Sequence, residues 1–116
     1  MVIVNSIFTR RSIRKYLNKE VDNSIIEQLL KAAMQAPSAG NQRPWEFIVV
    51  REKELLNQLG LVSPYSGPEK ESNVAIIVLG NLANETVKFP ECVQQDLAAA
   101  TQNILLQATE LDLGTV

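Results

Sequence analysis

The sequence has 116 residues, of which 11 are Lys or Arg, 13 are Asp or Glu and none is His, so its formal net charge is −2 at pH 7. This length is typical of one domain, and we expect a single domain over residues 1–116. The net negative charge argues against general nucleic-acid binding, which needs a cationic surface. The missing histidine excludes a histidine-based triad and a typical catalytic zinc site.

Three further features indicate where the protein works. The single cysteine, Cys92, has no partner for an internal disulfide, which favours a reducing compartment. The longest apolar run, residues 74–79, is far shorter than the roughly 20 residues that cross a bilayer. At the N-terminus the charges follow the apolar residues, the reverse of a signal peptide. The sequence therefore predicts a soluble cytoplasmic protein without a membrane partner.

A basic segment follows a short apolar stretch at the N-terminus. Residues 2–9 have room for one or two helical turns, and residues 10–16 read Arg-Arg-Ser-Ile-Arg-Lys-Tyr. In an extended backbone alternate side chains share a face, which would place Arg10, Ser12 and Arg14 together. Guanidinium groups and a hydroxyl on one face are suited to a phosphate and a polar ring edge. The alternative is a solvated basic turn, or a weak patch for acidic partners.

The first long helix is predicted over residues 21–35. Its apolar stripe consists of Ile26, Leu29, Leu30 and Ala33. Two starts are possible: Asp22 as N-cap with a hydrophobic staple, or Ser24 as N-cap with a capping box. Pro37 ends the helix, because the residue before a proline is disfavoured in the helical region.

The loop at residues 36–45 reads Ala-Pro-Ser-Ala-Gly-Asn-Gln-Arg-Pro-Trp and joins this helix to a strand pattern. Gly40 and Asn41 are the residues that best tolerate left-handed backbone angles. Such a loop presents backbone N–H groups and short polar side chains at a fixed place, which suits a polar or anionic ligand. Local composition by itself favours the alternative, an ordinary helix-to-strand connector with Trp45 in the core.

Two strands and a short helix are predicted next. The strands cover residues 46–50 and 74–80, and their apolar character indicates a sheet that is covered on both faces. The helix covers residues 52–59, with Gly60 as its C-terminal stop. Residues 61–73 are predicted to be mostly loop, with room for one helical turn.

The longest helix is predicted over residues 91–111, with Gly114 ending it. Most of its faces are apolar, which fits a helix that is buried all round or shared with a second subunit. We interpret Cys92, at its start, as a small core residue, since no histidine exists to activate it as a nucleophile. Tyr65, in the preceding loop, either packs or covers a ligand, and we favour packing.

In chain order, these segments resemble the nitroreductase family of FMN-dependent oxidoreductases. The resemblance rests on the basic block at residues 10–16, the capped helix after it, the loop at residues 36–45, and the later segments 96–106 and 110–114. It covers essentially the whole chain. It implies an α+β fold with a mixed central sheet flanked by helices, and an intertwined homodimer with two FMN sites at the subunit interface.

The resemblance also implies roles for particular residues. The FMN phosphate, ribityl chain and pyrimidine edge would be held by Arg10, Arg11, Ser12 and Arg14. The FMN of the other subunit would be reached by Pro37, Ser38, Ala39 and Asn41. Tyr65 would line the substrate pocket, and no catalytic side chain or metal site is implied. Family members often have Gln directly before the Pro-Trp pair, where this chain has Arg43, so neither Arg43 nor Gln42 is given a role.

The implied activity is an FMN-dependent oxidoreductase that transfers a hydride from NAD(P)H through flavin to a nitroaromatic, quinone or similar small-molecule acceptor. Because the cofactor carries the electrons, no protein nucleophile is required. Family members are longer, so we expect this chain to correspond to about their N-terminal two-thirds, with a sheet incomplete at the C-terminus. The alternative is a non-catalytic dimeric domain of the same ancestry, for flavin binding or interaction, that has lost turnover with its C-terminal part.

Overall fold

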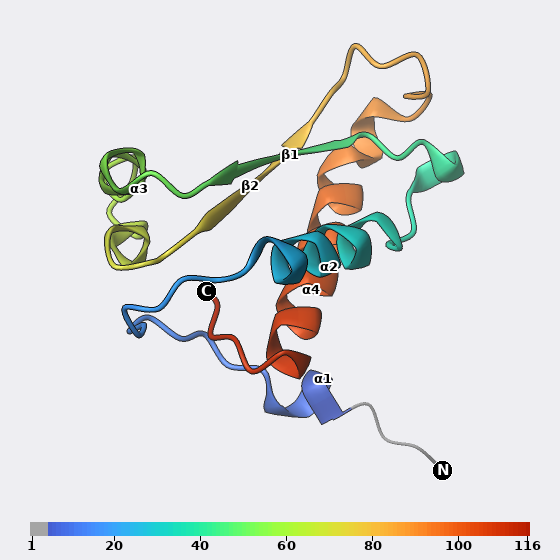
Figure 1. Cartoon of the computed structure of the whole chain (residues 1–116). Helices are drawn as coiled ribbons and strands as arrows, with labels where there is room; N and C mark the ends of the chain where they lie inside the picture. Colours follow the sequence, from blue (N-terminus) through green and yellow to red (C-terminus); the bar gives the residue numbers. More distant parts are fainter. Residues whose placement is uncertain (1–4) are drawn as a thin grey trace.

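The computed structural model describes residues 5–116 and is shown in Figure 1. Its helices and strands are α1 (Asn5–Thr9), α2 (Asn23–Met34), β1 (Trp45–Val50), α3 (Lys53–Leu59), β2 (Ala75–Gly80) and α4 (Val93–Glu110). Short 3-10 turns occupy Ala39–Asn41, Gly67–Lys70 and Pro90–Cys92. The predicted helices and strands are therefore confirmed to within a few residues at each end. Residues 2–4 of the predicted N-terminal turns lie outside the described residues.

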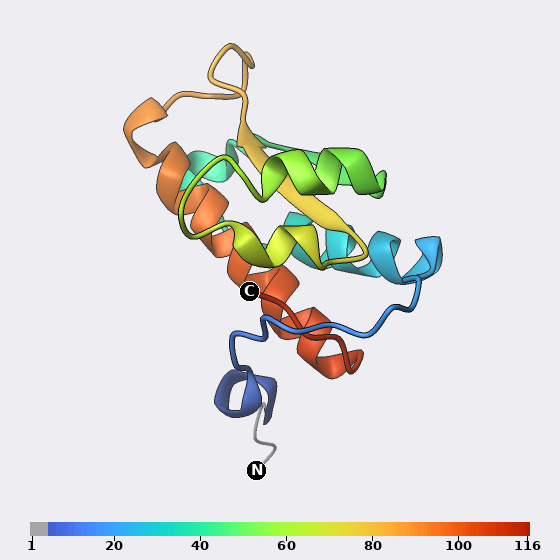
Figure 2. The same cartoon turned by 90° about the vertical axis from the view of Figure 1, so that its left-hand side faces the viewer.

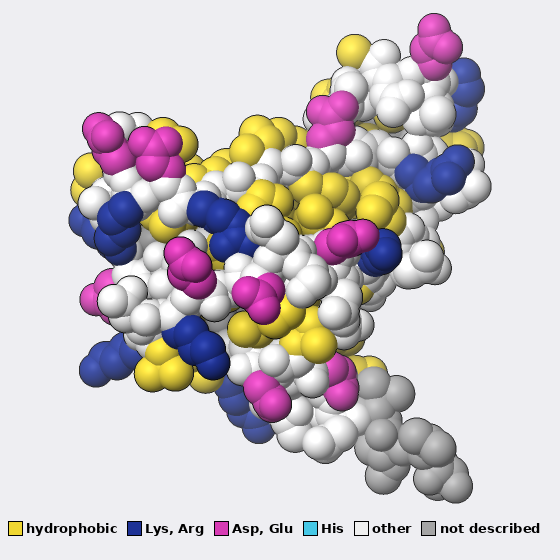
Figure 3. Space-filling view, in the orientation of Figure 1, with side chains coloured by type: hydrophobic (Ala, Val, Ile, Leu, Met, Phe, Trp, Pro, Cys, Tyr) yellow, Lys and Arg dark blue, Asp and Glu magenta, His cyan; other side chains and the backbone are white. Residues whose placement is uncertain are grey.

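The two strands pair in antiparallel fashion, with Trp45 opposite Gly80 and Val50 opposite Ala75. One face of this sheet packs on the core through Phe47 and Val78, which lie opposite each other. On the other face Ile48 is 49% exposed, and a band of apolar side chains follows the strands in Figure 3. Within this chain, helices α2 and α4 cover one face, so the prediction of a sheet covered on both faces is wrong for the described residues.

The core lies where α2 packs against α4 beneath the sheet (Figures 1 and 2). Its buried members are Ile26, Leu29, Ala33, Ala36, Trp45, Ala100, Ile104 and Ala108. Three of these alanines have no exposed surface, which lets the two helix backbones approach closely. The side-chain amide of Asn103 also donates to the Ala32 carbonyl across the helix pair, at 2.9 Å. The prediction that Trp45 belongs to the core is confirmed.

Helix α4 is buried along one stripe, formed by Val93, Asp96, Ala100, Ile104 and Ala108. These positions are three or four residues apart, as one face of a helix requires. Gln94, Gln95 and Gln102 are exposed. One of the two expectations for this helix was burial on every side. The described chain alone does not bury α4 in that way.

The helix ends correct two details of the sequence analysis. Asp22 is the N-cap residue of α2, as one of the two predicted starts required, but its side chain makes no capping hydrogen bond. Beyond α4, Asp112 adopts a left-handed φ of 59°, so Asp112 and not Gly114 reverses the chain. Across residues 5–116, no helix combines the length and the apolar character needed to cross a membrane.

Candidate functional site

The basic segment lies alongside the last residues of the chain (Figure 2). Ser12 forms an isolated parallel bridge with Thr115, and the Ile13 N–H donates to the Thr115 carbonyl at 2.7 Å. The backbone is therefore extended at Ser12, which is the condition under which side chains alternate. The approach is close because Gly114 has no side chain: a Cβ there would lie 2.9 Å from the Ile13 side chain.

The cations of this segment differ in how they are used. The Arg11 guanidinium donates to the Phe8 and Arg10 carbonyls, at 2.9 and 2.7 Å, and so is held by local backbone. Arg10 is half-buried, and Ser12 and Arg14 are exposed. Among residues 5–116, no ion pair or side-chain hydrogen bond engages these last three side chains. Three donor groups of the segment are thus uncommitted.

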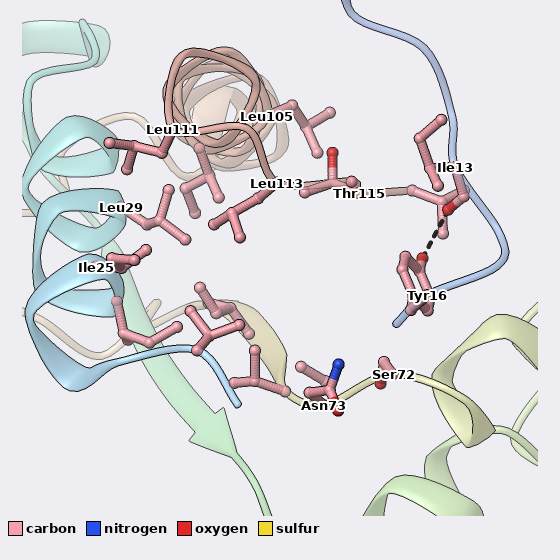
Figure 4. Close-up of a pocket in the computed structure, with 18 of the residues that line it drawn as sticks. Ile13, Tyr16, Ile25, Leu29, Ser72, Asn73, Leu105, Leu111, Leu113 and Thr115 are labelled. Carbon is pink, nitrogen blue, oxygen red and sulfur yellow. Dashed lines mark hydrogen bonds between the residues drawn. The ribbon is translucent and has the colours of Figure 1, made fainter. Parts of the chain in front are cut away.

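A cavity of about 580 Å³ lies between the basic segment, α2, β2 and the residues that follow α4 (Figure 4). Ile13, Lys15 and Tyr16 line it, whereas Arg10, Ser12 and Arg14 do not. The Tyr16 hydroxyl donates to the Ile13 carbonyl at 2.7 Å, which fixes the ring at the cavity wall. The three uncommitted side chains are therefore not part of the cavity wall, and because the adjacent Lys15 and Tyr16 both line it, the cavity lining does not test the predicted alternation.

The loop after α2 contains three residues with left-handed backbone angles. Gly40 and Asn41 both have a φ of 55°, which confirms the expectation of left-handed angles there. Arg43, at 45°, is a third left-handed residue that the sequence did not suggest. Gly40 is required for space as well, since a Cβ at this position would lie 2.6 Å from the Phe89 ring. Pro37 and Asn41 are exposed, and Ser38 and Ala39 are half-buried.

Two buried polar residues hold this loop, and the sequence analysis missed both roles. Gln42 is 1% exposed and Asp96 is 4% exposed. The Gln42 amide donates to Asp96 Oδ2 at 2.7 Å and to the Phe89 carbonyl at 3.0 Å, and its oxygen accepts the Lys88 and Phe89 N–H groups. The other Asp96 oxygen accepts the Ala39 N–H at 2.9 Å. The available signal was Asp96 itself, an acidic residue on the apolar stripe of α4.

The basic segment and the loop lie at opposite ends of α4 (Figure 1). The loop is bonded to Asp96 in the first turn of α4, and the basic segment is bonded to Thr115, beyond its last turn. At 1.5 Å per residue, the part of α4 from Asp96 to its end at Glu110 is about 21 Å long. One chain therefore does not bring the two predicted groups of site residues together.

Tyr65 is in neither group. Its side chain is 90% exposed, on the loop between α3 and the Gly67–Lys70 turn, and it is not part of the cavity wall. The structure thus gives Tyr65 no packing role within the described chain.

The architecture is that of an α+β protein with a small antiparallel sheet on a pair of packed helices. A sequence profile described as the nitroreductase family matches residues 7–71, and the chain belongs to that family. The matched residues include both the basic segment and the loop after α2. The resemblance that these motifs suggested is confirmed.

Similar proteins extend the comparison to the whole chain. A protein of Methanothermobacter thermautotrophicus, provisionally named NADH dehydrogenase/NAD(P)H nitroreductase, is 47% identical over all 116 residues, which cover 60% of its length. A crystal structure of a Clostridium acetobutylicum protein, provisionally named NADH oxidase, is 50% identical, with a TM-score of 0.90 over 94% of this chain and 64% of that one. An FMN-dependent nitroreductase from Clostridium difficile is 36% identical, with a TM-score of 0.83 over 97% and 63% of the two chains. The chain thus spans less than two-thirds of these relatives.

Proposed function

We propose that this chain forms the cofactor-holding part of an FMN-dependent oxidoreductase, which transfers a hydride from NAD(P)H to a nitroaromatic, quinone or similar small acceptor. The observation that carries the proposal is the set of three uncommitted donors, Arg10, Ser12 and Arg14, in a segment whose backbone is extended at Ser12. Family membership and the similarity to an FMN-dependent nitroreductase support it.

The donor chemistry of the basic segment fits the phosphate end of FMN. Guanidinium groups are permanently charged and offer paired N–H donors that match phosphate oxygens. Arg10 and Arg14 have no competing carboxylate among residues 5–116, so phosphate binding breaks no existing ion pair there. Arg11 serves its own backbone in this structure, and we assign it a supporting role at the edge of the site.

The second half of the site comes from the loop, in a second copy of the chain. Within one chain, the loop that carries Pro37, Ser38, Ala39 and Asn41 is bonded to Asp96, and the helix from Asp96 to its end at Glu110 is about 21 Å long at 1.5 Å per residue. We infer that a single FMN touching both groups is held by two copies, which agrees with the homodimer implied by the sequence. Each copy would contribute one half to each of two sites.

Bound FMN supplies the hydride-transfer chemistry between NAD(P)H and the acceptor. The task of the chain is to bind and orient. Fixed cations and N–H groups stabilise negative charge on a bound ring without having to reorganise during the reaction. The absence of histidine is compatible with this role, because no protein group has to act as a nucleophile.

A titration of the purified protein with FMN, followed by quenching of flavin fluorescence, tests the proposal. Arg10→Ala should weaken FMN binding roughly 10- to 100-fold, since a hydrogen bond to a charged group contributes about 1.5–3 kcal/mol. Lys31→Ala removes an exposed charge on α2 and serves as the matched control, with no expected change. Unchanged FMN affinity in Arg10→Ala would overturn the assignment of the basic segment.

A second measurement separates turnover from binding. FMN bound to the wild-type protein should lose its visible absorption when NADPH or NADH is added without oxygen. Stoichiometric binding without such bleaching would instead support the non-catalytic flavin-binding domain. If the protein retains no yellow colour after excess FMN has been added and the unbound FMN removed, both the oxidoreductase and the flavin-binding domain are overturned.

A further inference from the structure

We propose that Asp96 and Gln42 are positioning residues, which hold the turn at residues 38–43 in the shape that meets the cofactor. This inference rests on the proposed function. Neither residue belongs to the set that the family resemblance assigns to FMN. Both are buried, whereas Gly40 and Asn41 of the turn are exposed.

The Asp96 carboxylate bridges the two ends of the turn. Oδ1 accepts the Ala39 N–H at 2.9 Å, and Oδ2 accepts the side-chain N–H of Gln42 at 2.7 Å. These two bonds bracket Gly40 and Asn41. A buried carboxylate needs hydrogen-bond donors, and within the described chain the donors to Asp96 come from this turn alone.

The turn needs such external support, because its own backbone is strained. Asn41 and Arg43 adopt left-handed angles, which are unfavourable for residues other than glycine. The turn has three internal hydrogen bonds: the Asn41 N–H donates to the Ser38 carbonyl at 2.9 Å, the Gln42 N–H to the Ala39 carbonyl at 3.0 Å, and the Arg43 N–H to Ser38 Oγ at 3.0 Å. Ser38 Oγ thus serves as an acceptor within the turn and keeps its own proton for another partner.

Gln42 connects the turn to the segment before α4. Its side chain makes four hydrogen bonds: one to Asp96 and three to the backbone of Lys88 and Phe89. The backbone carbonyl of Gln42 accepts a hydrogen bond from the Thr86 hydroxyl at 2.7 Å. The turn, this segment and the start of α4 are therefore joined by hydrogen bonds into one unit. Losing a hydrogen bond to the Asp96 carboxylate should for this reason shift the residues that face the cofactor.

Asp96→Asn is the direct test, because it keeps the shape of the side chain. It replaces one acceptor oxygen with an NH₂ group, which must face either the Ala39 N–H or the Gln42 amide. We expect FMN affinity to fall about tenfold at a temperature where circular dichroism shows the variant folded. We also expect faster hydrogen exchange at residues 38–43.

Asn103→Ala is the matched control, since Asn103 lies on the same helix and makes one part-buried hydrogen bond, to Ala32. It should lower thermal stability and leave FMN affinity within about twofold. Thr86→Val is a milder second variant, which removes the hydroxyl bond to Gln42 at an exposed position. It should weaken FMN binding in the same direction by a smaller factor, even if Asp96→Asn fails to fold.

The outcomes distinguish this inference from the proposed function. If the wild type binds FMN and Arg10→Ala weakens binding, but Asp96→Asn and Thr86→Val bind FMN as the wild type does, only the positioning role is overturned. If Asn103→Ala loses as much affinity as Asp96→Asn, general destabilisation explains both and the positioning role is again overturned. A wild type that does not bind FMN overturns both proposals.

Discussion

Replacing Gly40 with alanine tests the local geometry of the loop. Gly40 has a φ of 55°, where an alanine is destabilised by about 1–2 kcal/mol relative to ordinary backbone angles. The new Cβ would also lie 2.6 Å from Phe89 Cε2. Phe89 is 42% exposed, so its ring can move aside, and we expect this displacement to add about 0.5–1 kcal/mol, the lower part of the range for an off-rotamer side chain.

The expected total for Gly40→Ala is therefore a loss of about 1.5–3 kcal/mol in the free energy of unfolding. Urea unfolding can be followed by the fluorescence of Trp45, the only tryptophan, which is 9% exposed in the core. With a slope of about 2 kcal/mol per molar urea, the midpoint should fall by about 1 M.

Two further variants separate the causes. Gly67→Ala is the matched control, because a Cβ at Gly67 meets nothing within 4 Å. It should change stability by no more than about 0.5 kcal/mol. In a Phe89→Ala background the steric part of the Gly40→Ala loss should vanish and the backbone part should remain. A Gly40→Ala protein as stable as the Gly67→Ala protein would refute the reasoning.

Two other substitutions test the fold at separate places. Asp112→Gly removes a side chain from a left-handed position with a φ of 59°, and should raise the free energy of unfolding by about 0.5–1 kcal/mol; a lower urea midpoint would contradict this. Leu29→Ala, at a core position that is 4% exposed, should lower it by about 2–5 kcal/mol. A loss below about 1 kcal/mol in the same urea experiment would show that the α2–α4 contact is less well packed than the structure indicates.

The helices and strands were predictable because their signals are local. The apolar stripe of α2 and the apolar runs of the two strands each lie within a short stretch of sequence. Each element can therefore be recognised from its own residues alone. Trp45 was expected in the core and lies there. The exposed outer face of the sheet was not foreseen, because strand composition does not tell how many helices pack on it.

The bonds that hold the candidate site were not predictable from local pattern. Gln42 and Asp96 are 54 residues apart in sequence, and nothing near either one marks the other as its partner. Gly114 was interpreted as a helix stop. In the structure, its lack of a side chain leaves room for Ile13, which lies 101 residues earlier in the sequence. For the basic segment, the bridge at Ser12 shows extended backbone at that point, and the alternation of its side chains stays a prediction.

The separation of the two groups of site residues by α4 predicts how mutations in two different copies of the chain would combine. If each site joins the basic segment of one copy to the loop of another, a chain with a defective basic segment and a chain with a defective loop are each inactive when alone. A mixed pair of the two, however, contains one site built only from undamaged halves. Two separate lesions at opposite ends of one helix would then complement each other in trans, whereas two lesions at the same end would not.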